Sequence, residues 1–105
     1  MLKEQQDQNT AGRNQVMTET RVAVISIIVE NEDAVQKVNE ILHDYRAYII
    51  GRMGIPYRIK GISIISVAID APQDRISALS GKIGKLPGIS AKTAYSNVIT
   101  GAQRT

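Results

Sequence analysis

The chain has 105 residues, 43% of them hydrophobic, and a formal net charge of +3, a composition typical of one small globular domain. It contains no cysteine, which excludes disulfides, thiolate catalysis and cysteine-ligated zinc or iron–sulfur clusters. The charge is too small to indicate nucleic-acid binding by itself, so direct binding to DNA is not expected. No apolar run approaches the ~20 residues of a membrane span, and we expect a cytoplasmic protein with no membrane partner.

The chain divides into a central patterned region and two polar ends. Residues 1–19 are rich in Gln, Asn, Thr and Glu, and such a segment buries too little apolar surface to offset its ordering entropy. We therefore predict a flexible N-terminal tail over 1–19, a folded domain over 20–99 and a C-terminal tail over 100–105.

The folded region begins with a predicted strand over residues 21–30 (RVAVISIIVE), which has apolar side chains on both of its faces. Asn31 is predicted to cap a helix, because Glu32 and Asp33 place negative charge in its first turn. This helix is expected to end near Arg46. Its apolar stripe consists of Val35, Val38, Leu42 and Tyr45, reinforced by Ala34 and Ile41.

A second strand is predicted over residues 47–57 (AYIIGRMGIPY), followed by a turn over 58–61. Gly51 and Gly54 indicate bulges or a close approach of backbone. Pro56 has no N–H to donate to a neighbouring strand. Together these residues predict that the strand lies at an edge of the sheet.

The second half of the domain repeats the pattern. Residues 61–70 (GISIISVAID) predict a third strand, Pro72 suits the first turn of a second helix, and the Pro-Gly pair at 87–88 ends that helix. Residues 89–96 predict a fourth strand, which residues 98–99 either extend or leave in order to pack elsewhere. The apolar stripe of the second helix consists of Ile76, Leu79, Ile83 and Leu86.

This order of elements predicts an α+β fold of the ferredoxin-like type, a β-α-β-β-α-β sandwich. The expected sheet is antiparallel with strand order 4-1-3-2, and both helices cover the same face. The uncovered face of the two central strands would then carry a large apolar patch, which is rarely left in water. We therefore predict a homodimer or homotetramer, formed by stacking or by continuing the sheets. The predicted interface residues are Val22, Val24, Ile28, Ile62 and Ile64.

The glycine-rich second strand and the turn after it contain the strongest candidate for a ligand site. Arg52 and Arg58 could clamp a small anion beside the exposed backbone of Gly54 and the side chain of Tyr57, between subunits. The alternative is that the arginines only protect an edge strand from unwanted pairing.

Two other segments contain weaker candidate sites. His43 and Asp44 could contribute to a metal site, but one imidazole and one carboxylate are an incomplete ligand set, and a solvent-facing histidine at a helix C-terminus is the simpler interpretation. Residues 80–85 (SGKIGK) lack the spacing of a phosphate loop, and Gly81 is expected instead to let its helix approach the sheet closely. No catalytic set can be assembled, so we predict no enzyme activity, no cofactor and no metal.

The segments 51–57 (GRMGIPY) and 76–89 (ISALSGKIGKLPGI) resemble a small family of regulators assigned to the iron-only hydrogenase system of anaerobic bacteria. The resemblance covers residues ~19–96 and implies an ACT-like domain, similar to the ligand-binding half of the nickel-responsive repressor. That repressor uses a histidine cluster and a cysteine, whereas this chain has only His43 and no cysteine, so nickel binding is not expected. The sequence thus predicts a non-enzymatic, homo-oligomeric regulatory module that binds a small anion. The alternative is a structural or protein-interaction module without a ligand.

Overall fold

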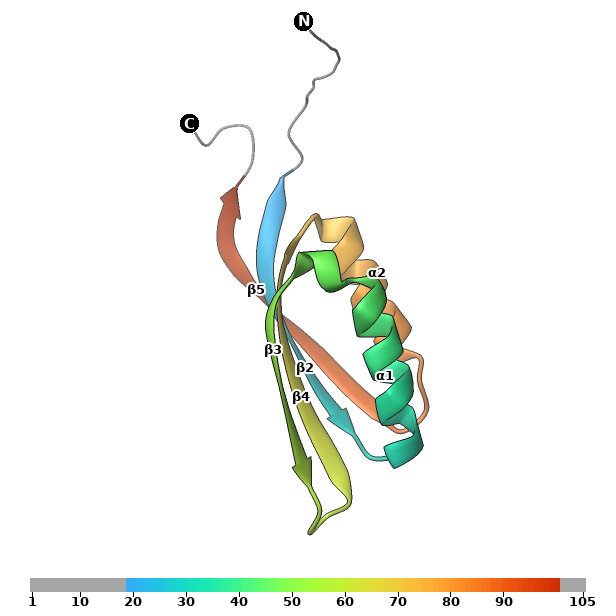
Figure 1. Ribbon diagram of the computed structural model, residues 1–105. Coiled ribbons are helices and arrows are strands. Elements are labelled where there is room, and N and C mark those ends of the chain that lie inside the picture. Colours follow the sequence, from blue (N-terminus) through green and yellow to red (C-terminus); the bar gives the residue numbers. More distant parts are fainter. Residues whose placement is uncertain (1–18, 101–105) are drawn as a thin grey trace, which may run out of the picture.

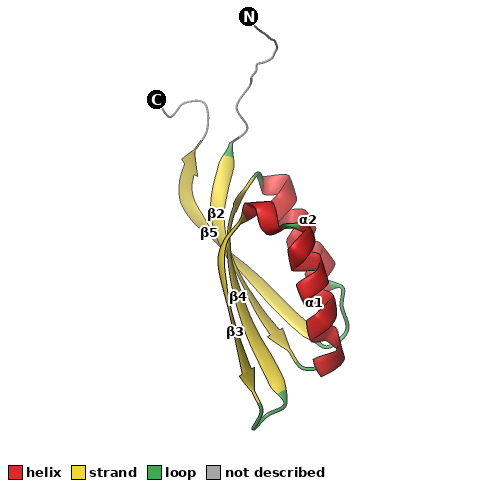
Figure 2. Cartoon of the chain, in the orientation of Figure 1, coloured by secondary structure: helices red, strands yellow, loops and turns green. Residues whose placement is uncertain are grey.

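A computed structural model describes residues 19–100, which form a four-stranded antiparallel sheet with two helices packed against one face (Figure 1, Figure 2). The strand order is β3-β4-β2-β5, which is the predicted 4-1-3-2 when the strands are counted along the chain. The ferredoxin-like, ACT-like fold prediction is confirmed. The elements are β2 (Thr20–Val29), α1 (Glu32–Asp44), the 3₁₀ helix η1 (Arg46–Tyr48), β3 (Ile49–Tyr57), β4 (Ile62–Ala71), α2 (Gln73–Gly84) and β5 (Ile89–Thr100).

The core lies between the helices and the two central strands. On β2 and β4 every second side chain is buried beneath the helices, and the pairing of Ile25 with Val67 and of Ile27 with Ile65 aligns these side chains across the sheet. Each helix buries the centre of its predicted apolar stripe, whereas Val35, Ile41 and Leu86 at the margins are half-buried. The largest fully buried side chains are Ile25, Ile27, Val29, Val38, Leu42, Val67, Ile69, Ile76, Leu79 and Ile83.

The first helix starts as predicted and ends differently. The Asn31 side chain accepts a hydrogen bond from the backbone N–H of Asp33, which caps the N-terminus of α1. α1 ends at Asp44, and the chain then forms η1 in place of the predicted first residues of β3. This short turn keeps Tyr45 buried and Tyr48 packed against the core, so burial of the two rings outweighs an earlier start of the strand.

β3 lies at the edge of the sheet, as predicted. The register of β3 against β4 shifts between Ile49 and Gly51, which is the bulge that Gly51 indicated. Gly54, by contrast, stays in regular register opposite Ile65. A Cβ atom added at Gly54 would meet no atom within 4 Å, so that glycine serves neither a bulge nor a close backbone approach.

The second helix starts slightly differently from the prediction, because Pro72 is the N-cap of α2 rather than a residue of its first turn.

The glycines of the second helix and its following loop have different roles. The expectation for Gly81 is wrong, because a Cβ atom there would meet nothing within 4 Å and the residue is exposed on the helix. The close approach occurs instead at Gly88, where φ is +75° and a Cβ atom would lie 2.9 Å from Asn31 Cβ.

The last strand is longer than residues 89–96, since β5 continues to Thr100. The predicted tails fall on residues outside the described part of the chain, apart from Glu19 and Thr100 at its two ends. Within the described residues, neither helix has the length and apolar composition needed to cross a membrane.

Candidate functional site

A pocket of about 240 Å³ opens between α1 and the hairpin formed by β3 and β4. We call it the α1–β3 pocket. The described residues that line it come from three elements. They are Val35 and Asn39 from α1, Arg52, Gly54, Ile55 and Pro56 from β3, and Ser63 and Ile65 from β4.

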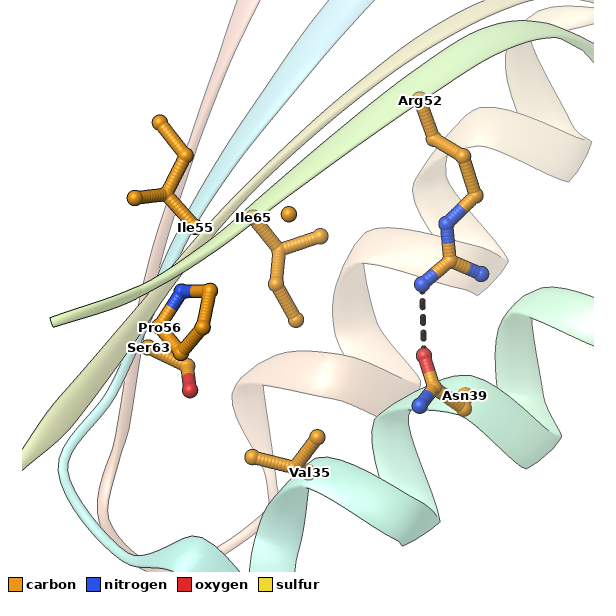
Figure 3. Close-up of a pocket in the computed structure, with 8 residues that line it drawn as sticks. Val35, Asn39, Arg52, Ile55, Pro56, Ser63 and Ile65 are labelled. Atoms are coloured by element: carbon orange, nitrogen blue, oxygen red, sulfur yellow. Dashed lines mark hydrogen bonds between the residues drawn. The ribbon is translucent and has the colours of Figure 1, made fainter. Parts of the chain in front are cut away.

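Arg52 and Asn39 form the polar end of the pocket. Arg52 pairs with the buried Val67 of β4, so its side chain lies on the face of the sheet that carries the helices. There the guanidinium donates a hydrogen bond from Nη2 to the side-chain oxygen of Asn39 (Figure 3). Among residues 19–100, Asn39 is the one side chain that hydrogen-bonds to Arg52, and both residues are exposed. The remaining N–H groups of the guanidinium can therefore reach an incoming anion.

The rest of the pocket is mainly apolar. Val35, Pro56 and Ile65 lie on its inner side, with Ser63 contributing a hydroxyl group, whereas Ile55 extends to the other side of β3 (Figure 3). Gly54 adds no side chain, and this leaves the space open. Among the described residues, no Asp or Glu lines the α1–β3 pocket, and Arg52 supplies the one formal charge there.

The structure separates the four residues that the sequence grouped as a ligand site. Arg52 and Gly54 line the α1–β3 pocket, but Tyr57 pairs with Ile62 and lies on the opposite face of the sheet. Arg58 belongs to the exposed turn between β3 and β4. An anion held by Arg52 would therefore not contact Tyr57 or Arg58 of the same chain.

Sequence reasoning missed Asn39, Ser63 and the pocket-lining role of Val35. The spacing of Val35 and Asn39, four residues apart, places both on one side of α1 and is the signal that was available. Val35 was assigned to the core stripe, yet it is only half-buried while its neighbour Ala34 is buried. A residue at the margin of an apolar stripe is well placed to line a pocket.

The second feature of note is the sheet face opposite the helices, which we call the open face. It carries apolar side chains from three strands, in register across the sheet, with Ser26 paired to Ser66 in the middle. Its large side chains are Val22, Val24, Ile28, Met53, Ile55, Tyr57, Ile62 and Ile64. Seven of these eight are between 37% and 57% exposed, and Ile62 is half-buried. All five predicted interface residues are therefore on this face.

The histidine lines neither the α1–β3 pocket nor the open face. His43 lies in the last turn of α1 and is exposed, as is Asp44. Its backbone carbonyl accepts a hydrogen bond of 2.9 Å from Arg46 Nη1. In the described part of the chain, no three His, Cys, Asp or Glu side chains gather in a group that could hold a metal ion.

These observations define a small ferredoxin-like domain with a cationic pocket beneath one helix and an apolar sheet face turned to solvent. Residues 21–93 match the TM1266-like family, described as "Iron-only hydrogenase system regulator, putative". The match covers most of the chain, and the chain belongs to this family. The resemblance found in the sequence is thereby confirmed.

The solved structures that are similar to the chain include one from Thermotoga maritima and one from Pseudomonas putida KT2440. Uncharacterized protein TM1266 from Thermotoga maritima is 36% identical, with a TM-score of 0.70, over 72% of this chain and 96% of that one. A formyltetrahydrofolate deformylase from Pseudomonas putida KT2440 is 16% identical, with a TM-score of 0.56, over 73% of this chain and 29% of that one. The second likeness shows the fold alone. No curated protein matches the sequence.

Proposed function

We propose that the protein is a cytoplasmic, non-enzymatic regulatory module of the iron-only hydrogenase system that works as a homo-oligomer and responds to a small anion. The family description supports the regulatory role. The open face is the single observation that carries the oligomer, and the α1–β3 pocket supports the anion.

The open face suits a second copy of the chain. Strands about 4.8 Å apart, with a rise of about 3.3 Å per residue, give the whole four-stranded face, including the polar Ser90 and Lys92 that β5 adds to it, an area of about 600 Å². Two such faces would together bury about 1,200 Å², the lower end of the range for stable specific interfaces. Two copies related by a two-fold axis would present the same apolar surface to each other, so one patch serves both partners.

Ile64 lies inside this surface and provides the test. It is 39% exposed on β4, with Ile28 of β2 and Ile55 of β3 as its partners on either side. Replacing Ile64 with Lys would place an unpaired charge in the interface, which is costly because the charge loses its water. We expect a dimer or tetramer for the native chain and a monomer for Ile64→Lys, measured by sedimentation equilibrium at micromolar concentration.

Ile59 offers a matched control for this substitution. It lies in the β3–β4 turn, outside the paired strand residues that form the open face, and is 82% exposed. Ile59→Lys makes the same chemical change and is expected to leave the oligomer intact. A native chain that sediments as a monomer would remove the oligomeric part of the proposal.

Arg52 is the residue we propose for the anion. The sequence predicts an anion between subunits, whereas the α1–β3 pocket lies on the face opposite the proposed interface. We therefore place the anion in the pocket of each subunit. Arg52→Ala is expected to abolish the rise in melting temperature caused by the anion, while leaving the melting temperature of the free protein within a few degrees.

If the chain forms an oligomer and no phosphate or carboxylate stabilises it, the alternative holds. The protein would then be a structural or protein-interaction module without a ligand. The oligomer and the anion are tested separately, so failure of one leaves the other in place.

A further inference from the structure

The α1–β3 pocket presents one cation beside an apolar interior, and this combination selects a chemical class of ligand. The exposed guanidinium of Arg52 forms no ion pair within the described residues. Its planar fork of N–H donors matches the two oxygens of a carboxylate. The charged end of a ligand is therefore expected at Arg52.

The inner part of the pocket favours an apolar body on the same ligand. Val35, Pro56 and Ile65 reach it from three different elements, and Gly54 leaves it unfilled. Filling this space with hydrocarbon removes apolar surface of both partners from water, which is favourable. A phosphate ion would contact the polar end and leave the apolar part in water.

The charges around the pocket also argue against an amino acid. A zwitterion would bring an ammonium group close to its own carboxylate and hence to Arg52. Within residues 19–100, no Asp or Glu lines the pocket to pair with that ammonium group. Its desolvation and its repulsion by the guanidinium would then oppose binding.

The size of the pocket limits the ligand further. At about 240 Å³ it is smaller than the ~300–1,000 Å³ of sites for drug-sized molecules. We propose that the α1–β3 pocket binds a small aliphatic monocarboxylate without an amino group, with the carboxylate on Arg52 and the hydrocarbon chain between α1 and β3. This inference rests on the proposed function, since it names the class of the anion at the same site.

Isocaproate is the probe, because leucine is the same molecule with an added α-amino group and isocaproamide is its neutral counterpart. Calorimetric titration of the full chain with isocaproate is expected to show saturable binding of one molecule per chain. Leucine and isocaproamide are each expected to bind at least ten-fold more weakly, and phosphate is expected to show no saturable binding.

Gly54→Val tests the location of the site. No atom lies within 4 Å of the added Cβ, so the side chain can enter the pocket without a clash, and valine is well suited to a strand. We expect this variant to fold and to bind isocaproate at least ten-fold more weakly. Gly51→Val is the matched control, because Gly51 has the same free space but does not line the pocket.

Three outcomes would overturn the inference in distinguishable ways. If phosphate bound as tightly as isocaproate, the need for a hydrocarbon chain would be wrong, and if leucine did so, the exclusion of an amino group would be wrong. In either case, loss of that binding in Arg52→Ala would leave anion binding at Arg52 standing. If none of the four probes bound an oligomeric native chain, both the class and the proposed anion would be wrong. Isocaproate binding that was undiminished in Gly54→Val would show that the site lies elsewhere.

Discussion

Arg52 on β3 donates a hydrogen bond to the side-chain oxygen of Asn39 on α1, thirteen residues earlier in the chain. This contact joins the edge of the sheet to the helix that covers it, and it holds the cation at the mouth of the α1–β3 pocket. Because Asn39 is neutral, it orients the guanidinium without cancelling its charge. The positive charge stays available to a ligand.

The first prediction concerns this neutrality. Asn39→Asp would change the amide to a carboxylate of nearly the same shape, which would pair with Arg52 and compete with any anion. We expect the apparent affinity for the anion, measured from the stabilisation that the anion causes, to fall at least ten-fold. The free energy of unfolding should change by no more than about 1 kcal/mol, because exposed ion pairs contribute little.

Asn97→Asp is the control for the charge change. Asn97 is exposed on β5, at the edge of the sheet opposite β3. The affinities of the two variants for the anion are compared by titration at equal ionic strength. Equal loss of affinity in both would attribute the effect to net charge and not to the contact with Arg52.

A second prediction separates two glycines that look alike in the sequence. Gly88→Ala places a side chain where φ is +75° and only 2.9 Å from Asn31 Cβ, so both strain and a clash result. A left-handed conformation alone costs a non-glycine residue about 1–2 kcal/mol, and we expect at least that loss of stability in urea denaturation.

Gly81→Ala is expected to have the opposite sign. A Cβ atom at Gly81 meets nothing within 4 Å, and alanine in a helix is favoured over glycine by about 0.5–1 kcal/mol. We therefore expect a higher denaturation midpoint for Gly81→Ala. A lower midpoint would mean that α2 approaches a surface at Gly81 after all.

The third prediction concerns the start of α1. The Asn31 side chain accepts a hydrogen bond of 3.0 Å from the backbone N–H of Asp33. Asn31→Ala removes this cap and should lower the free energy of unfolding by about 0.5–2 kcal/mol. Asn31→Asp keeps an accepting oxygen and should restore most of the stability. If both variants lost the same amount, the cap would not be the cause.

The fourth prediction concerns the core. Leu79 on α2 is fully buried, and Leu79→Ala should cost about 2–5 kcal/mol through lost burial and the cavity left behind. Unfolding should be measured at one fixed protein concentration, since an oligomer gains apparent stability with concentration. Ile59→Ala, at an 82% exposed turn position, should change stability by less than about 0.5 kcal/mol.

The amino-acid sequence determined the fold because its signals are local. The periods of the apolar residues mark four strands and two helices, and connections between such elements admit few topologies. The helix cap at Asn31 and the edge position of the strand with Pro56 depend on local bonding of the residue itself, so the sequence predicted both. The uncovered apolar face followed from the same periods.

The tertiary structure alone decided the composition of the pocket. The odd spacing of Arg52 and Tyr57 on one strand already puts them on opposite faces, but only the bulge and register of β3 decide that Arg52 faces α1 and Tyr57 the open face. The meeting of Arg52 with Asn39, and of Gly88 with Asn31, depends on how helices and loops pack over the sheet. The spacing of these contacting residues along the chain follows no helix or strand period, so the contacts could not be predicted from the sequence pattern.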